Sequence, residues 1–368
     1  MHLQYSSRIQ KIEAVLDKWL PETPGPVWAQ EIFSGLEKVP DAQMLSALTL
    51  PARDLLSRGG KRWRPLLMTL VCETLVGGDA ALSLSPLVEF CHNASLIHDD
   101  IEDNSDERRG GPAIHLLYGL DTAINSGCFL YFLSLSCIQN WAGELEPKSA
   151  IGIDALTGRV YSLWAVYMKR LHLGQAMDIS WHRDFLSLPS IEDYHVMCTL
   201  KTGCLARFSA CLGVCAAGAV NGKALEHEKA LAKLFGEAAE SLGVGFQILD
   251  DVKNLGGSIP GKKKGDDIAE GKKSLPVLMY LHRYPEQGEF VSRCFAAARK
   301  DGAETSEAEE LIQAIDAAGI LSEAEEQGQK LIAHARDAIT HAECDFSLHE
   351  ESRMLLAGLS DMISQRVK

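Results

Sequence analysis

The segment LVEFCHNASLIHDDIED, residues 87–103, holds the pattern that decides the fold. Apolar side chains recur along it every three or four residues, which is the period of a helix with one buried face. That stripe consists of Leu87, Phe90, Cys91, Ala94 and Ile97. It leads directly into Asp99, and Asp103 follows four residues later. The segment therefore predicts a long buried helix that ends in carboxylates stacked one turn apart.

A second segment repeats this arrangement. Apolar residues from Leu231 to Leu249 recur at helical spacing, and Asp250 and Asp251 follow at once. Alternating β-branched runs are nearly absent, so the period predicts helix almost everywhere and an all-α fold. No repeat and no flexible linker divides the chain. We expect a single domain over residues 1–368, with its core at about 45–280 and a C-terminal helical extension at about 280–368.

Composition narrows the classes of partner. Lysine and arginine total 36 against 50 aspartate and glutamate, a formal charge of -14, which disfavours nucleic acid and anionic membrane surfaces. No segment reaches the roughly 18 uncharged apolar residues of a membrane span, so we expect no stable membrane anchor. The ten cysteines lack zinc-like spacing and are expected to be reduced. These features predict a soluble cytoplasmic protein.

The two acidic pairs are candidates for binding metal. Carboxylate oxygens one turn apart suit Mg²⁺, although a solvated acidic helix end is the alternative for each pair taken alone. The run after Asp99 lacks the glycine and the terminal glutamate of a calcium-binding EF-hand loop. Mg²⁺ usually takes one or two carboxylates and completes its shell with water and phosphate oxygens. Two carboxylate sets therefore favour a diphosphate between them.

Several basic segments stand out in this acidic chain. They are GGKRWRP at 59–65, Arg108-Arg109, Lys201-Thr202, and the loop GKKKG at 261–265 with Lys272 beyond it. Each alone would be a solvated surface. Arginine offers phosphate a bidentate fork and lysine a point charge, so together the segments suit a second diphosphate bound without metal.

These segments resemble the ordered motifs of one family. GGKRWRP, LIHDDIEDNSDERRG, GQAMD, KTG, GFQILDDVKNL and GKKKGDDIAEGKKSLP occur in order between residues 59 and 276. They resemble the motifs of trans-isoprenyl diphosphate synthases, the polyprenyl synthetases, and are most similar to geranylgeranyl diphosphate synthases. The resemblance implies a single bundle of long helices around a deep central cavity, the isoprenoid synthase fold, assembled as a homodimer.

The resemblance also implies the reaction. An allylic diphosphate (dimethylallyl, geranyl or farnesyl) ionises, isopentenyl diphosphate attacks the carbocation in trans, and a proton is lost. About three Mg²⁺ ions per active site, or Mn²⁺ in their place, would stabilise the departing diphosphate. The leaving diphosphate serves as the base, so no side-chain base is required.

Individual roles carry over onto the matching positions. The implied metal-binding residues are Asp99, Asp100, Asp103, Asp250 and Asp251. The implied ligands of the allylic diphosphate are Arg108, Lys201 and Lys262. Those implied for isopentenyl diphosphate are Gly60, Lys61, Arg64, His92 and Arg109. Thr202, Gln247 and Asp178 match positions that line the allylic site, and Lys272 matches a lysine near the same diphosphate.

Product length depends in this family on the residues below the first aspartate motif. Ala94 and Ser95, next to Cys91 on the same helix, are small where an aromatic residue would stop growth at farnesyl diphosphate. Deeper in the cavity, Tyr131, Phe132 and His172 resemble the floor of geranylgeranyl synthases, with ordinary core aromatics as the alternative. We expect geranylgeranyl diphosphate as the product, with longer chains next.

Two features depart from the family pattern, and two other functions compete. Asn254 stands where the fuller second motif has aspartate, which leaves it a doubtful metal ligand, and residues 140–159 match no motif. A terpene cyclase would need neither GGKRWRP nor His92. A non-catalytic partner subunit would typically lose one aspartate motif, whereas this chain keeps both.

The metal assignment predicts that Asp99→Ala and Asp250→Ala each abolish turnover and leave the fold intact, because each removes a carboxylate that binds a cation. Steady-state assays and circular dichroism of the purified variants test this. Near-normal turnover in either variant would refute that assignment.

Overall fold

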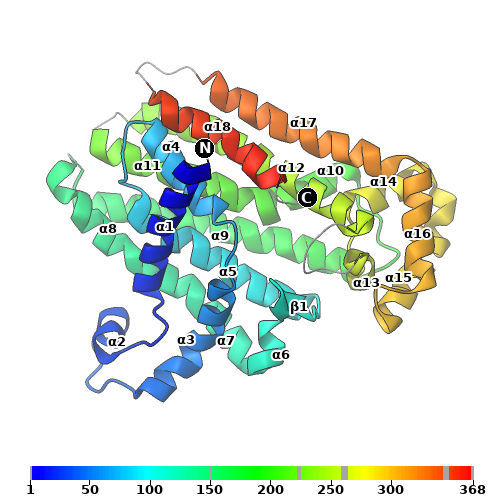
Figure 1. Cartoon of the computed structure of the whole chain (residues 1–368), viewed down its shortest axis with the longest axis horizontal. Helices are drawn as coiled ribbons and strands as arrows, with labels where there is room; N and C mark the ends of the chain where they lie inside the picture. The colour runs from blue at the N-terminus through cyan, green and yellow to red at the C-terminus, as the bar shows by residue number, and fades with distance from the viewer. Residues whose placement is uncertain (1, 150, 222–224, 258–263, 343–347, 366–368) are drawn as a thin grey trace. The chain divides into compact units, whose positions relative to one another are not determined.

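The computed structural model describes residues 2–149, 151–221, 225–257, 264–342 and 348–365. Within these ranges the chain is helical, with one short antiparallel hairpin, so the predicted all-α fold class is confirmed (Figure 1).

The elements up to residue 149 are α1 (His2–Trp19), α2 (Pro26–Ile32), α3 (Ala42–Ser57), α4 (Trp63–Thr74), η1 (Leu82–Leu84), α5 (Ser85–Glu102), β1 (Glu107–Arg108), β2 (Gly111–Pro112), α6 (Ile114–Tyr118), α7 (Leu120–Leu133), η2 (Ser134–Ser136), α8 (Cys137–Leu145) and η3 (Glu146–Lys148). The later elements are α9 (Ile153–Arg183), α10 (Ile191–Cys198), η4 (Thr199–Gly203), α11 (Cys204–Asn221), α12 (Leu225–Gly256), α13 (Asp266–Glu270), α14 (Leu275–Arg283), η5 (Pro285–Gln287), α15 (Gly288–Asp301), α16 (Ser306–Ala317), α17 (Ile320–Thr340) and α18 (Glu350–Gln365).

The chain divides into two compact units, which are described separately below. The first unit comprises residues 1–165, 208–233 and 344–356, and the second comprises 166–207, 234–343 and 357–368. The expected C-terminal extension is helical, from α15 to α18. A single domain over residues 1–368 stays a prediction.

The first unit is built around α5. This helix packs against α3, α4 and α7, and α1 packs against both α4 and α5. Every residue of the stripe that the sequence predicted, from Leu87 to Ile97, is fully buried. Burial of each large apolar side chain contributes about 1.5–3 kcal/mol, so this face fixes the rotation of α5 and hence the direction of Asp99.

The second unit has two hydrophobic clusters. One joins α10, α12 and α14 with α17 through residues that include Tyr194, Ile248, Leu278 and Ala324. The other joins residues of α13 to α17, among them the fully buried Phe295, and also includes Leu255 of α12. The first cluster buries α12 up to Leu249 and so places Asp250 and Asp251 at the edge of a packed core.

One helical run is apolar enough to need comment. By length and composition alone, Ile191–Asn221 could cross a bilayer, but 89% of its most apolar window is buried inside the protein. Core helices pass the same test, so this run carries no argument for a membrane span.

Close packing at Gly174 of α9 gives a stability prediction. A Cβ atom there would lie 2.4 Å from the backbone nitrogen of Lys201 and 2.7 Å from the carbonyl carbon of Leu200. We expect Gly174→Ala to lower the free energy of unfolding by about 2–3 kcal/mol, because backbone on both sides would have to move. Urea unfolding measures this.

Gly158 on the same helix is the matched control, since nothing lies within 4 Å of a Cβ built there. Gly158→Ala should raise stability by about 0.5–1 kcal/mol through helix propensity. Equal stability of the two variants would contradict the packing described for Gly174.

Candidate active site

The first aspartate motif lies at the C-terminal end of α5. The helix ends at Glu102, and the Asp103 N–H donates to the Asp99 carbonyl at 2.8 Å. Asp99 is partly exposed, whereas Asp100 is fully buried. The structure thus confirms that Asp99 and Asp103 stand one helical turn apart.

Asp100 is the anchor for Arg108. The Arg108 Nε donates to Asp100 Oδ1 at 2.7 Å, and its Nη2 contacts Asp100 as well. The same Nη2 lies 3.4 Å from Asp99 Oδ2. Arg108 therefore offsets the repulsion between the neighbouring carboxylates of Asp99 and Asp100 and is held in place beside them.

A two-residue turn presents Arg109. The strands β1 and β2 pair with Arg108 opposite Gly111, and Arg109 and Gly110 have φ of 53° and 72°. Positive φ at both central residues is the pattern of a type I′ hairpin. Arg58 fastens the hairpin by donating from Nη1 to the carbonyls of Arg108 at 3.0 Å and Pro112 at 2.8 Å. The hairpin therefore directs the side chains of Arg108 and Arg109 toward different partners.

The GGKRWRP segment meets Arg109 at Gly60. A Cβ on Gly60, whose φ is 145°, would lie 3.2 Å from Arg109 Nη2 and 3.1 Å from Arg62 Nη1. Only glycine lets the backbone approach these guanidinium groups so closely. A role for Gly60 in binding isopentenyl diphosphate stays a prediction.

His92 lies beside Arg64. The Arg64 Nη1 is 3.3 Å from His92 Nε2, and Arg64 also stacks on the Trp63 ring at 4.5 Å. Burial holds the pKa of His92 well below its usual value, and Arg64, Arg109 and other nearby arginines add to this. A neutral ring can accept from Arg64 at Nε2 when the proton is on Nδ1. The first unit thus brings Gly60, Arg64, His92 and Arg109 into one basic cluster.

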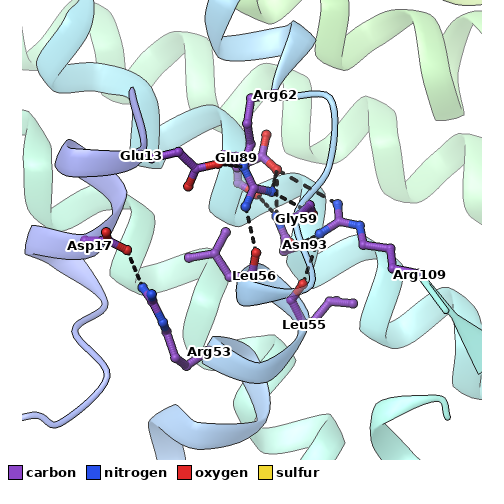
Figure 2. A network of polar contacts seen from close by, with 10 residues as sticks. All are labelled: Glu13, Asp17, Arg53, Leu55, Leu56, Gly59, Arg62, Glu89, Asn93 and Arg109. Carbon is purple, nitrogen blue, oxygen red and sulfur yellow. Dashed lines mark hydrogen bonds and ion pairs between the residues drawn. The ribbon is translucent and has the colours of Figure 1, made fainter. Parts of the chain in front are cut away.

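The analysis of the sequence missed four residues beneath this cluster. Arg62 is buried and pairs with Glu89 at 2.8 Å and Glu13 at 2.7 Å, while Asn93 accepts from Arg109 at 3.0 Å (Figure 2). Burial opposes the charge of Arg62, yet Glu89 and Glu13 raise its pKa above the usual value. Glu89 and Asn93, polar residues four apart next to the apolar stripe of this helix, were the signal available in the sequence.

The second aspartate pair separates into one open and one buried carboxylate. Asp250 is partly exposed, whereas Asp251 is buried and accepts three hydrogen bonds. The donors are the Tyr194 hydroxyl at 2.7 Å, Gln247 Nε2 at 2.9 Å and the Leu275 N–H at 3.0 Å. Burial raises the pKa of Asp251, and the three donors oppose that rise. Asp251 therefore supports the helix end that presents Asp250.

The KTG motif joins this network through a π-helix, Thr199–Gly203. Lys201 Nζ lies 2.6 Å from Asp178 Oδ2, and the Thr202 hydroxyl donates to Gln247 Oε1 at 2.9 Å. Single π-turns inside helices often mark functional sites. The resemblance placed four residues around the allylic site. They form two neighbouring pairs, Lys201 with Asp178 and Thr202 with Gln247.

Asn254 has a structural role. It is buried, its Oδ1 accepts from the Asp267 N–H at 3.1 Å, and its carbonyl accepts from the Gly265 N–H at 3.0 Å. It therefore holds the start of α13. Lys272 pairs with Glu270 at 2.5 Å. Lys262 lies outside the residues that the structure describes.

The residues expected to set chain length differ in burial. Cys91, Ala94 and Tyr131 are buried, and the Tyr131 ring stacks on His98 with centroids 5.9 Å apart. Phe132 is 66% exposed in the single chain, because neighbouring helix residues project about 100° apart and cannot share one face. The roles of Phe132 and of His172, which is also exposed, stay predictions.

The carboxylates suit a metal that completes its shell with other ligands. Among the described residues no group of three or more His, Cys, Asp and Glu side chains forms a ready metal cage. Mg²⁺ does not require one, since it binds one or two carboxylates and keeps its remaining positions for water and phosphate oxygens. Asp99 with Asp103 in the first unit, and Asp250 in the second, fit that chemistry.

Carboxylates at the ends of two buried helices, with arginines and lysines held beside them, define a class of all-α enzymes that bind diphosphates through a divalent metal. The polyprenyl synthetase family model matches residues 46–315, and the chain belongs to this family. It is a trans-prenyl diphosphate synthase, with isoprenyl diphosphates as substrates.

Individual relatives agree with this assignment. A geranylfarnesyl diphosphate synthase of Aeropyrum pernix is 33% identical over 326 residues, which cover 85% of this chain and 92% of the relative. A geranylgeranyl pyrophosphate synthase of Claviceps paspali is 32% identical over 264 residues, 71% of each chain. The crystal structure of geranylgeranyl pyrophosphate synthetase from Pyrococcus horikoshii has a TM-score of 0.75 at 26% identity, covering 99% of this chain and 98% of that one.

A polyprenyl synthase from Caulobacter crescentus, solved with calcium and isoprenyl diphosphate, shares the fold. Its TM-score is 0.75 at 23% identity, and the match covers 99% of this chain and 96% of that chain.

The bonding of Asp251 predicts the effect of Tyr194→Phe. Loss of one donor to a buried carboxylate should lower the free energy of unfolding by about 1–3 kcal/mol. Chemical denaturation measures the change. Tyr161→Phe is the control, because Tyr161 is exposed on α9 and should tolerate the change. Equal stability of the two variants would show that the hydroxyl does not support Asp251.

Proposed function

We propose that this enzyme condenses isopentenyl diphosphate with an allylic diphosphate, head to tail, to give geranylgeranyl diphosphate. One observation carries the proposal: Gly60, Arg64, His92 and Arg109 form a basic cluster that includes none of the aspartates assigned to the metal. A terpene cyclase ionises one diphosphate and needs no such second cluster. A condensing enzyme does, because isopentenyl diphosphate keeps its diphosphate throughout.

Mg²⁺, or Mn²⁺ in its place, would neutralise the charge that builds on the departing diphosphate, with Asp99, Asp103 and Asp250 as its protein ligands and about three ions per active site. Arg108 and Lys201, each already held by a carboxylate, add positive charge for the allylic diphosphate. Lys61, Arg64 and Arg109 bind isopentenyl diphosphate. His92 lies beside Arg64, and its lowered pKa favours a neutral ring that adds no further cation to this cluster.

Product length follows from the helix face below Asp99. Ala94 and Ser95 are small, and the buried Tyr131 lies farther along the same unit. The geranylgeranyl and geranylfarnesyl names of the relatives support a product of about this size. Chains longer than geranylgeranyl are the second candidate.

A homodimer in the cytoplasm is part of the same proposal. The outer face of α6 and α7 exposes Leu117, Leu120, Ile124 and Phe132, an apolar surface that a second copy of the chain would cover. Analytical ultracentrifugation of the purified chain tests the dimer.

The reaction itself is tested with purified protein, Mg²⁺, isopentenyl diphosphate and each allylic primer in turn, with the products sized by mass. Linear diphosphates of the geranylgeranyl length support the proposal. Cyclic hydrocarbons would indicate a cyclase, and no product at all would indicate a partner subunit.

The chain-length argument predicts that Ser95→Phe shortens the product from geranylgeranyl to farnesyl diphosphate, since an aromatic ring replaces a small side chain below Asp99. Product analysis by mass spectrometry measures this. Ser95→Ala is the control, because it loses only the hydroxyl that donates to the His92 carbonyl at 2.8 Å. A geranylgeranyl product from Ser95→Phe would contradict the assignment.

A further inference from the structure

Arg62 lies inside the GGKRWRP motif, yet its own partners enclose it. Its side chain is 1% exposed, and every guanidinium nitrogen donates to a protein oxygen (Figure 2). Nε donates to Glu13, Nη1 to Glu89 at 2.8 Å and to the Gly59 carbonyl at 3.2 Å, and Nη2 to the Leu56 carbonyl at 2.6 Å. Four of the five N–H groups of this guanidinium are bonded to protein, and the side chain is buried, so Arg62 acts on the protein around it.

These bonds fix the conformation of the loop before α4. Arg62 has φ of 47°, a left-handed conformation that is unfavourable for a residue with a side chain. Its two carbonyl acceptors, Leu56 and Gly59, lie at the end of α3 and the start of the loop. The side chain of Arg62 therefore closes the loop that carries Gly60 and Lys61.

Glu89 connects this loop to Arg109. Its Oε1 accepts from Arg62, and the Asn93 Nδ2 donates to the same oxygen at 3.0 Å. Asn93 Oδ1 in turn accepts from Arg109 Nη1 at 3.0 Å, and the Leu55 carbonyl accepts from it at 3.1 Å. One buried carboxylate thus orients the arginines on both sides of Gly60.

The positive charges of Arg62 and Arg109 lie close together and are balanced by the Glu89 carboxylate. Burial, together with repulsion from Arg62 and Arg108, lowers the pKa of Arg109 to about 10, although the Glu89 carboxylate opposes this fall. Guanidinium groups crowded in a buried site are held in place only when carboxylates neutralise them. The buried Glu89 of α5 supplies one such negative charge, and Glu13 of α1 supplies the other.

Glu13 belongs to α1, which precedes the residues 46–315 that match the family model. Its carboxylate accepts from Arg62 Nε at 2.7 Å and is partly exposed, so it closes the outer end of the network. Figure 2 shows the Glu13 side chain reaching from α1 to Arg62. Helix α1, which lies outside the matched part of the chain, thus contacts Arg62 of the GGKRWRP motif.

We propose that Glu13, Arg62 and Glu89 are positioning residues which hold the Gly59–Lys61 loop and Arg109 in the geometry that binds isopentenyl diphosphate, so that α1 is a working part of that site. The inference rests on the proposed function. None of the three residues touches the substrate, and their effect passes through Gly60, Lys61 and Arg109.

The test is Glu13→Gln in the full-length enzyme, which removes the charge and keeps the shape. The KM for isopentenyl diphosphate should rise about five- to tenfold, the change expected when a charged hydrogen bond weakens. The KM for the allylic primer and kcat at saturation should stay within about twofold, a split that general loss of structure does not produce. Glu13→Asp keeps the charge at shorter reach and should restore part of the affinity.

Asp17→Asn is the matched control. Asp17 lies one turn further along α1, is more exposed, and pairs at 2.5 Å with Arg53, which also contacts the Leu20 carbonyl and Glu22. This pair lies apart from the basic cluster in Figure 2. Both KM values should be unchanged in Asp17→Asn, and thermal unfolding should show both variants folded.

An unchanged KM for isopentenyl diphosphate in Glu13→Gln would overturn the inference, as would an equal rise in Asp17→Asn. Calorimetric titration with isopentenyl diphosphate separates this failure from that of the proposed function. A wild-type enzyme that binds the ligand without elongating a primer would overturn the function, and weaker binding by Glu13→Gln would still support the inference. A wild-type enzyme that does not bind it would overturn both.

Discussion

The buried carboxylate of Glu89 is the constraint on which the first unit depends. It lies on α5 among apolar residues that include Phe90, and a charge taken out of water there is costly unless cations and donors surround it. Arg62 and Asn93 meet that requirement directly. To reach Glu89, the chain must close the loop before α4 and direct the hairpin turn toward α5. The need to neutralise the Glu89 carboxylate thus shapes the neighbouring basic cluster.

Both aspartate motifs divide their work in the same way. In each pair one carboxylate is buried and bonded to the protein, Asp100 to Arg108 and Asp251 to Tyr194, while its neighbour, Asp99 or Asp250, keeps partial exposure. Helix geometry explains this, because consecutive side chains project about 100° apart and one turns into the core when the other faces outward. In each pair the buried carboxylate holds in place the helix end that carries the open one.

Membership of the polyprenyl synthetase family gives these arrangements a common purpose. Ionisation of a prenyl diphosphate requires cations that are in place before charge develops, since reorganising them during the reaction would add to the barrier. Arg108 on Asp100 and Lys201 on Asp178 are cations fixed in this manner. The connected bonds of Thr202, Gln247 and Asp251 do the same for the helix end that carries Asp250.

The sequence by itself determined the all-α class, the burial of α5 from Leu87 to Ile97 and the placement of Asp99 and Asp103 one turn apart, because local periodicity fixes which residues share a helix face. Family motifs located Gly60, Arg64, His92 and Arg109. Only the tertiary structure decided that Arg62 is enclosed by protein partners, that Asn254 holds α13 and that Phe132 faces outward. Those outcomes depend on partners far along the chain, such as Glu13 for Arg62, and on which face of a helix a neighbour covers. A local sequence pattern predicts neither the distant partner nor the face that a neighbour covers.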